Sequence, residues 1–382
     1  MQTIGIICEY NPFHNGHLYH LEQIKNRYPD SRIVLVMSGN FTQRGEPSLL
    51  NKWQKTEIAL KFGVDLVIEL PFPFATQSAD IFAKGAIQIL NALKVDRLVF
   101  GSESNDIELL NTMADIQLYH KDYASIVKHH LKKGNNYPTA MAKALDTLSD
   151  QTITAPNDLL GLSYVKAIKQ NHSSIIAETI QRTNDYHDVT LSSSITSATS
   201  LRKALSEKKD ISNYVPSETI SYYQGSFALK EQYFPFLKYQ IFVHWDHLEQ
   251  FLGVDEGIEQ RIKKVISQAN SYEEFIHLLK TKRYTYQKIN RMLLHILCNF
   301  TKQKAKTYQD VPYLRILGFS KDGQTYLHEI KKEVSLPIVT SFSKNAHPML
   351  LDELFYTEIY SLIFPNATSI IRQEYQKSPI KW

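Results

Sequence analysis

Apolar and polar positions alternate in blocks along the first hundred residues, and the blocks have the lengths of strands and helices. Continuous apolar runs such as TIGIICEY at 3–10 and RIVLVMSG at 32–39 indicate short strands that are buried on both faces. The segment 17–29 has apolar residues at helical spacing and ends at a proline. The alternation continues with expected helices at 51–64 and 78–95 and expected strands at 65–72 and 96–103. This order predicts an α/β fold with a doubly wound parallel sheet, in which ligands bind at the carboxyl ends of the strands.

The pattern becomes mainly helical after residue 105. Residues 105–150 read as polar helices that form either an insertion into the sheet domain or an extension of it. Periodicity breaks over 209–235, which contains DISNYVPSE and a glycine, so we expect a domain boundary there. The prediction is an α/β domain at 1–210 and a mainly helical domain at 211–382. The other expected elements are helices at 156–170, 194–208, 236–309 and 349–364, and short strands at 174–182, 313–320 and 336–342.

Composition narrows the class of protein only slightly. The chain has 382 residues, of which 43% are hydrophobic and 21% are charged, as in ordinary folded domains. Its two cysteines, Cys8 and Cys298, lie far apart, which argues against a disulfide framework and favours a reducing compartment. The N-terminus lacks a basic leader, and no run of 18 apolar residues occurs, so we expect neither a signal peptide nor a membrane span. The net charge of +4 is a weak hint of an anionic partner.

Three histidines and a glycine follow the first predicted strand in the sequence HNGHLYH, at His14, Gly16, His17 and His20. Gly16 permits close backbone approach to a ligand, and the helix that begins there directs its N-terminal amides at the same space. Two imidazoles at such a place can donate hydrogen bonds to phosphoryl oxygens. The pattern therefore favours a polyphosphate site with His14 and His17 as catalytic residues. Two other interpretations stay open, namely surface histidines that open a helix and a zinc site formed by His14, His17 and His20.

The HNGH sequence resembles the H-x-G-H signature of the nucleotidyltransferase superfamily, which class I aminoacyl-tRNA synthetases share. That superfamily often carries a second, hydroxyl-rich motif with a basic residue near the start of a late helix. SITSATSLRK at 194–203 resembles this motif, and Arg202 and Lys203 are its basic residues. The resemblance makes Arg202 and Lys203 candidates for holding pyrophosphate.

An ordered set of further segments narrows the resemblance. The set consists of EYNPFHNGH, MSGNFTQRGEP, ELPFPFATQSAD, FGSE, PNDLLGLSYVKAI and KRYTYQKINRMLLHIL. Together these segments resemble the bacterial tRNA(Met) cytidine acetate ligase family, from about residue 1 to about residue 375. The resemblance implies an ATP-dependent ligase that activates free acetate as acetyl-adenylate and forms N4-acetylcytidine at the wobble position of elongator tRNA(Met). It also implies Mg²⁺ held mainly by the nucleotide and by water, and a cytoplasmic location.

The resemblance assigns ATP-binding residues by position. The main stretch runs through the histidine motif and comprises Ile7, Cys8, Glu9, Tyr10, Asn11, Pro12, Phe13, His14, Asn15, Gly16, His17, Leu18, Tyr19 and His20. Three more residues complete the set, namely Gly101 in FGSE, Asn157 in PND and Arg182 in IQRTND.

The loop GNFTQRGEPSLLNK at 39–52 follows the second predicted strand, so we expect it to rim the same crevice. It is either a polar surface loop or a lid, with Gln43 and Arg44 as candidates for an acetate or cytidine pocket. We interpret Asp65 and Glu69, which flank the third strand, as structural or surface residues.

A basic segment without Asp or Glu extends from Phe275 to Gln309, with Tyr284 and Tyr286 among its lysines and arginines. It is either a solvated helix face or a surface for the tRNA backbone, with tyrosines that stack on unpaired bases. The tRNA-binding candidates are Lys282, Arg283, Lys288 and Arg291.

Two other functions stay open at this point. The first is a small-molecule adenylyl- or cytidylyltransferase without an RNA substrate, which would leave the basic segment unexplained. The second is a non-catalytic nucleotide- or RNA-binding module.

Overall fold

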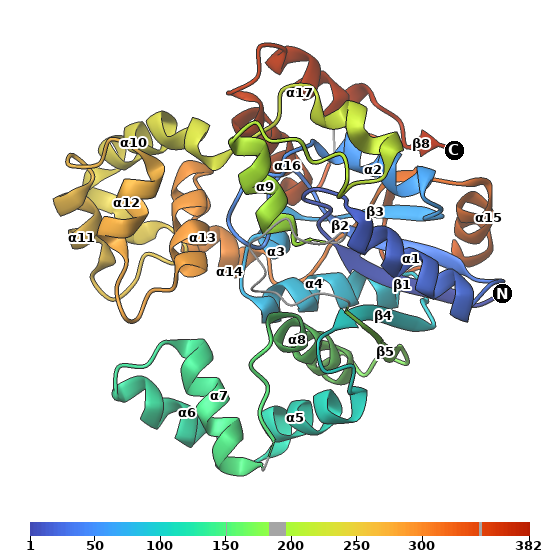
Figure 1. Cartoon of the computed structure of the whole chain (residues 1–382), viewed down its shortest axis with the longest axis horizontal. Coiled ribbons are helices and arrows are strands. Elements are labelled where there is room, and N and C mark those ends of the chain that lie inside the picture. Colours follow the sequence, from blue (N-terminus) through green and yellow to red (C-terminus); the bar gives the residue numbers. More distant parts are fainter. Residues whose placement is uncertain (150, 183–195, 344–345) are drawn as a thin grey trace.

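The computed structural model describes residues 1–149, 151–182, 196–343 and 346–382. Within these ranges its centre is an eight-stranded sheet in the order β5-β4-β1-β2-β3-β6-β7, with β8 paired to β6 (Figure 1). The first five strands are parallel, so the predicted doubly wound parallel sheet is confirmed. The strands are β1 Thr3–Cys8, β2 Arg32–Ser38, β3 Leu66–Leu70, β4 Arg97–Ser102, β5 Ile176–Gln181, β6 Leu314–Phe319, β7 Ile338–Val339 and β8 Ile380–Lys381.

Helices cover both faces of this sheet because its strands are apolar on both sides. Along β2, Val34 and Val36 pack into one hydrophobic cluster with residues of α4, α5 and α8. Leu35 and Met37 point the other way and pack with residues of α1, α2 and α9. The helices of this part are α1 Asn15–Arg27, α2 Lys52–Lys61, α3 Phe72–Ala75, α4 Ala79–Ala92, α5 Ile107–Tyr119, α6 Tyr123–Lys132, α7 Tyr137–Leu148, α8 Pro156–Gln170 and α9 Ala198–Ser206.

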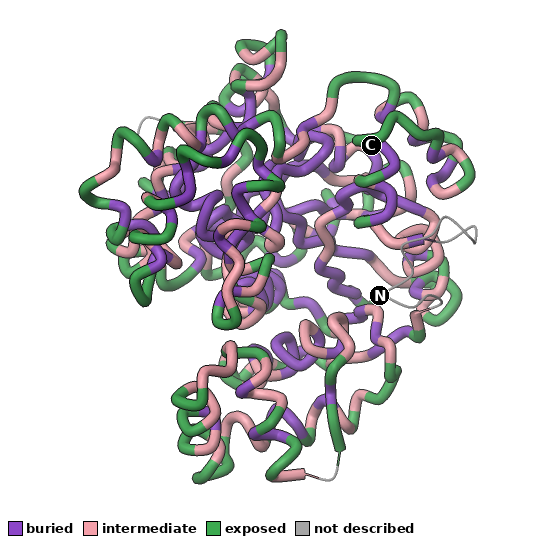
Figure 2. The backbone as a smooth tube through the Cα atoms, turned by 60° about the vertical axis from the view of Figure 1, so that its left-hand side comes forward, coloured by how far each residue is buried: buried purple, intermediate pink, exposed green. Residues whose placement is uncertain are grey.

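The polar segment at 105–150 forms α5, α6 and α7, as expected from its sequence. Helices α6 and α7 share only a small cluster around Val127, Ala140 and Ala144. Figure 2 shows this lobe at the lower end of the molecule, with far less buried backbone than the sheet region. The lobe therefore adds little to the main core.

Helices α10 to α14 form a helical unit on the left in Figure 1, and its hydrophobic cluster extends to Phe41, Phe72 and residues of α16 and α17. The bounds in the C-terminal part are α10 Phe234–Val243, α11 Ile258–Val265, α12 Tyr272–Leu279, α13 Tyr286–Leu297, α14 Lys302–Thr307, α15 Lys321–Ile330, α16 Pro348–Ser361 and α17 Ala367–Gln376. Short 3₁₀ helices lie at Ser217–Tyr223, Lys230–Tyr233 and Trp245–Gln250.

The strand predicted at 313–320 is confirmed as β6, but its place differs from the sequence prediction. It pairs antiparallel with β3 and so joins the N-terminal sheet, not the helical unit. The physical reason is that Ile316 packs into the cluster on one face of the sheet and Leu317 into the cluster on the other. A strand that is apolar on both faces needs a place inside a covered sheet. The exact division at residue 210 stays a prediction.

Candidate active site

The turn after β1 is fixed by contacts from three distant segments. Tyr10 has a φ of 47°, a left-handed conformation that turns the chain sharply after the strand. The Asn11 side-chain oxygen accepts a hydrogen bond from the Leu49 amide at 2.8 Å. The Arg202 guanidinium, from α9, donates to the Asn11 carbonyl at 2.8 Å. The Asn15 amide donates to the Tyr214 carbonyl at 3.0 Å. The turn is therefore rigid before any ligand arrives.

His14 and His17 are held in one tautomer by backbone amides. His14 is the N-cap of α1, and its Nδ1 accepts from the Gly16 amide at 3.0 Å. The His17 Nδ1 accepts from the His14 amide at 3.3 Å. Because Nδ1 accepts in both neutral rings, the proton lies on Nε2 in both. The ring centroids are 3.9 Å apart, so two Nε2–H donors stand side by side.

Both imidazoles are neutral near pH 7. Burial, followed by the charges of Arg182 and Arg202, lowers the pKa of His14 to about 3. Burial, followed by His14 and Arg182, holds the pKa of His17 well below its usual range. Burial and Arg182 lower the pKa of His20 to about 4. The positive charge of the site therefore comes from the two arginines, and the histidines contribute directed N–H groups.

The carboxyl end of β4 and the start of α8 form a second rigid corner. The Asp158 carboxylate accepts from the Ser102 hydroxyl at 2.5 Å and from the Glu103 amide at 3.0 Å. The Asn157 amide group donates to the Glu103 carboxylate at 2.6 Å. A Cβ at Gly101 would lie 3.2 Å from the Arg182 side chain, so glycine leaves room for that arginine. Sequence reasoning named Gly101 and Asn157 but missed the Glu103 and Asp158 carboxylates beside them, although FGSE and PND contain both.

The structure brings Arg182 and Arg202 to the histidine turn and leaves Lys203 outside. Arg182 follows β5, and its Nε is buried without a hydrogen-bond partner among the described residues. Arg202 contacts Asn11 and lies 3.2 Å from the Glu46 carboxylate. Lys203, the next residue on α9, is exposed. Residues 194 and 195 of the hydroxyl-rich motif lie outside the described residues, whereas the Ser197 side chain caps α9.

The loop at 39–52 is packed, so its interpretation as a polar surface loop is wrong. The Gln43 amide donates to the Glu9 carboxylate at 2.6 Å, and the Gln43 carbonyl accepts from Arg291 at 3.3 Å. Arg44 donates to the Thr199 hydroxyl at 3.0 Å. The loop thus joins the ends of β1 and α9 to α13 of the helical unit.

Lys55 lies directly behind this loop, and sequence reasoning missed it. Its ammonium donates to the carbonyls of Ser38 and Gly39 at 2.8 Å and of Glu9 at 3.1 Å. It is fully buried, and this burial lowers its pKa to about 7. The Cys8 thiol is partly buried, and desolvation, followed by the charge of Glu9, raises its pKa to about 12. Cys8 is therefore a packing residue and not a nucleophile.

The four basic candidates of the helical unit separate into two groups. Lys282 and Arg283 are exposed, whereas Lys288 lies 3.8 Å from the Tyr284 ring centroid and Arg291 reaches the Gln43 carbonyl. The expectation that Tyr284 stacks on a base is wrong, because its ring is buried and its hydroxyl donates to the Asp255 carbonyl at 2.6 Å.

Asp65 and Glu69 are structural residues. Asp65 accepts from the Ile33 amide at 2.9 Å and from the Ser320 hydroxyl at 2.7 Å. Glu69 is buried and lies 2.7 Å from Lys52, so it is not a surface residue.

Across the described ranges, no group of three or more His, Cys, Asp and Glu side chains is placed to hold a metal ion. In the same ranges, no helix combines the length and apolar character needed to cross a bilayer.

A parallel sheet whose first strand ends in a capped H-x-G-H turn, with arginines converging on it, defines a nucleotidyltransferase. A family model described as HIGH Nucleotidyl Transferase matches residues 1–375. A tRNA(Met) cytidine acetate ligase of Geobacillus sp. (strain WCH70) is 45% identical over 399 residues, covering all of both chains. The protein of that name from Bacillus subtilis (strain 168) is 42% identical, covering 100% of this chain and 98% of its own. The chain belongs to the tRNA(Met) cytidine acetate ligase family.

Two solved structures have the same fold throughout. Apo Thermotoga maritima TmcAL superposes with a TM-score of 0.92 at 33% identity, covering 100% of this chain and 99% of the other. The same protein bound with alpha-thio ATP gives a TM-score of 0.90 at 32% identity, with the same coverage.

Proposed function

We propose that this chain ligates acetate to the wobble cytidine of elongator tRNA(Met), with ATP converted to AMP and pyrophosphate. The observation that carries the proposal is the pair of Nε2–H donors on His14 and His17 beside Arg182 and Arg202. This arrangement presents two directed N–H donors and the positive charge of two arginines to an anion, although Arg202 also lies 3.2 Å from the Glu46 carboxylate. The structure of Thermotoga maritima TmcAL bound with alpha-thio ATP supports the choice of nucleotide.

The first step is attack of an acetate oxygen on the α-phosphorus of ATP, which breaks the bond to pyrophosphate and leaves acetyl-adenylate. His14 and His17 donate to the phosphoryl oxygens on which negative charge increases, and Arg182 and Arg202 balance the charge of the departing pyrophosphate. In the second step the cytidine amine attacks the acetyl carbonyl, the bond to AMP breaks, and the amine loses a proton. Gly101 and Asn157 belong to the nucleotide side of this site, at the ends of β4 and α8.

Mg²⁺ enters this proposal together with ATP, held by phosphate oxygens and water. The donor set at the turn consists of N–H groups and cations, which suits phosphate oxygens and not a divalent cation. A cytoplasmic location follows from the tRNA substrate.

The exposed lysine and arginine between α12 and α13 belong to the RNA surface in this proposal. Changing both Lys282 and Arg283 to alanine should weaken tRNA binding severalfold and reduce the slope of log K against log salt by about 2, one for each lost phosphate contact. The measurement is fluorescence anisotropy of labelled tRNA(Met) across a salt series. The matched control changes Lys331 and Lys332, which follow α15 at the amino edge of the sheet, and should leave both quantities unchanged. Wild-type affinity in the Lys282 and Arg283 variant would remove this surface from the proposal.

Exchange of radiolabelled pyrophosphate into ATP tests the proposed function itself. We expect exchange only when acetate is present, and acetate-dependent acetylation of tRNA(Met). Exchange at the same rate with and without acetate, in a protein that does not bind tRNA, would favour a small-molecule nucleotidyltransferase. Absence of exchange with every acid tested would favour a non-catalytic binding module.

A further inference from the structure

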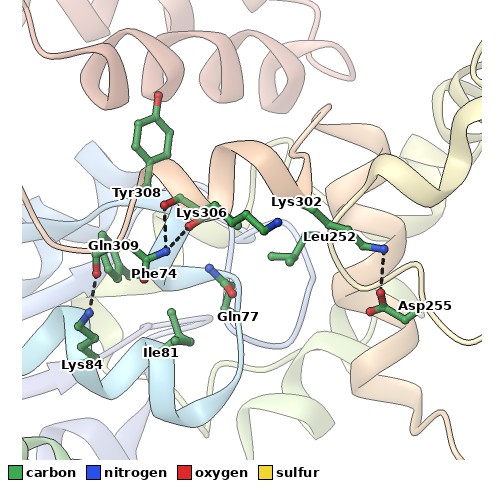
Figure 3. A pocket seen from close by; sticks show the side chains of 11 residues that line it. Phe74, Gln77, Ile81, Lys84, Leu252, Asp255, Lys302, Lys306, Tyr308 and Gln309 are labelled. Carbon is green, nitrogen blue, oxygen red and sulfur yellow. Dashed lines mark hydrogen bonds and ion pairs between the residues drawn. The ribbon is translucent and has the colours of Figure 1, made fainter.

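A cavity of about 380 Å³ lies between the sheet domain and the helical unit (Figure 3). Its floor comes from α3 and α4, and its other walls come from α14 and the segment around Leu252. The volume lies in the range of pockets that bind small organic groups. Nothing in the chemistry of the histidine turn uses this cavity.

The cavity lies at the same edge of the sheet as the histidine turn. Helix α3 begins at Phe72, directly after β3 ends at Leu70, so the cavity is at the carboxyl end of β3. Strand β3 is two positions from β1 in the sheet, a separation of about 10 Å at the usual strand spacing. The cavity and the histidine turn therefore follow different strands at the same edge of the sheet.

The cavity combines an apolar wall with hydrogen-bond acceptors. Ile81 and Leu252 are partly buried side chains on its wall, with Phe74 beneath them. The side-chain amide nitrogen of Gln77 donates to the Pro73 carbonyl at 2.5 Å, and that of Gln309 donates to the Ala305 carbonyl at 3.0 Å. Neither side-chain carbonyl oxygen accepts a hydrogen bond from another described residue, so both can accept from the amino groups of a ligand.

Three lysines give the cavity a positive rim. Lys302 lies 2.8 Å from Asp255, the one carboxylate among the lining residues, and Lys84 lies 3.0 Å from Asp310. Lys306 is exposed and has no ion-pair partner among the described residues. The rim therefore holds one uncommitted ammonium beside an apolar wall, a combination that fits a phosphate attached to a planar ring.

We infer that this cavity binds one unpaired nucleotide of an RNA strand, with the base against Ile81 and Leu252 and the adjacent phosphate on Lys306. The inference rests on the proposed tRNA substrate. An RNA strand fits better than a free nucleotide because Lys306 is exposed at the rim of the cavity. A phosphate bound there can continue into the backbone of a longer strand. The segment from Phe275 to Gln309, which includes Lys306, also lacks any acidic residue that would repel that backbone.

Two variants separate the phosphate contact from the base contact. Lys306→Glu reverses the rim charge, and Ala305→Phe fills the cavity without removing a lysine. Each should weaken binding of labelled tRNA(Met) about tenfold, the scale of one lost stacking or phosphate contact. Acetate-dependent ATP–pyrophosphate exchange without tRNA should stay at the wild-type rate, and melting temperatures should be unchanged. Lys332→Glu, at the opposite edge of the sheet, is the matched charge-reversal control.

The outcomes distinguish this inference from the proposed function. Wild-type protein that shows exchange and binds tRNA, together with variants of unchanged tRNA affinity, would overturn the cavity assignment alone. Wild-type protein that does not bind tRNA would overturn the proposed function as well. CMP is titrated in parallel: binding to the wild type that Ala305→Phe removes, with tRNA affinity unchanged, would assign the cavity to a free nucleotide and refute the inference.

Discussion

Replacing His14 and His17 by asparagine should abolish acetate-dependent ATP–pyrophosphate exchange and leave the fold intact. The Asn Oδ1 takes the place of the imidazole Nδ1, so the hydrogen bonds from the Gly16 and His14 amides are kept. Asparagine is also a favourable N-cap residue. Only the distal Nε2–H donors are lost. Loss of one preorganised donor to a developing oxyanion typically costs about 100-fold to 1000-fold in rate, so each single change should be severe.

The decisive comparison is between adenylate formation and tRNA binding. Both asparagine variants, and the corresponding alanine variants, should bind tRNA(Met) with nearly wild-type affinity, because the basic surface lies in the helical unit. His172→Asn changes a histidine in the turn after α8 and is the control for a generic histidine replacement. Exchange within a few fold of wild type in His14→Asn would show that the histidine turn does not act on the phosphates.

The pH dependence of exchange gives a second check on the same pair. A histidine whose pKa is lowered to about 3 stays neutral throughout the neutral and mildly acidic range. Activity that depends on neutral Nε2–H donors should therefore not fall between pH 8 and 6, where an ordinary histidine begins to take up a proton. A bound triphosphate raises the histidine pKa because its negative charge favours the protonated imidazole. The comparison therefore uses kcat/KM, which reports the ionisation of the free enzyme.

The parallel sheet could be predicted from sequence because its strands carry apolar residues on both faces. The run from Ile33 to Met37 needs no information from elsewhere in the chain to be recognised. The place of β6 could not be predicted in the same way. The sequence separation between Leu317 and its neighbours in β3 is about 250 residues, and periodicity carries no information on such pairings.

The candidate site was predictable where a single short segment carries its chemistry. His14, Gly16 and His17 lie together after the first predicted strand, so the short segment favoured a phosphate site, with a zinc site and surface histidines as alternatives. The contacts that fix the turn were not predictable, since Arg202 and Leu49 come from distant segments. Buried lysines were missed for another reason. Lys52 and Lys55 occupy the helical stripe that Ala59 continues, but charged residues are normally read as exposed.

Lys52→Met should destabilise the protein by about 3–5 kcal/mol, the usual cost of removing one partner from a buried ion pair. The Lys52 ammonium lies 2.7 Å from both Glu69 and Glu374, and all three side chains are 1% exposed. Burial lowers the pKa of Lys52, but Glu374 and Glu69 raise it, and the net direction is upward.

Urea unfolding at neutral pH measures this loss of stability, and the chain supplies a matched control. Lys377 pairs with Glu57 at 3.1 Å, but these side chains are 31% and 34% exposed. Lys377→Met should therefore cost no more than about 1 kcal/mol. A loss below about 1 kcal/mol for Lys52→Met would mean that water or Arg315, whose guanidinium lies 3.1 Å from Glu374, compensates the carboxylates. The ion-pair cluster joins α2, β3 and α17. Because Lys52 is also the last residue of the loop at 39–52, its replacement should reduce the stability of that loop as well.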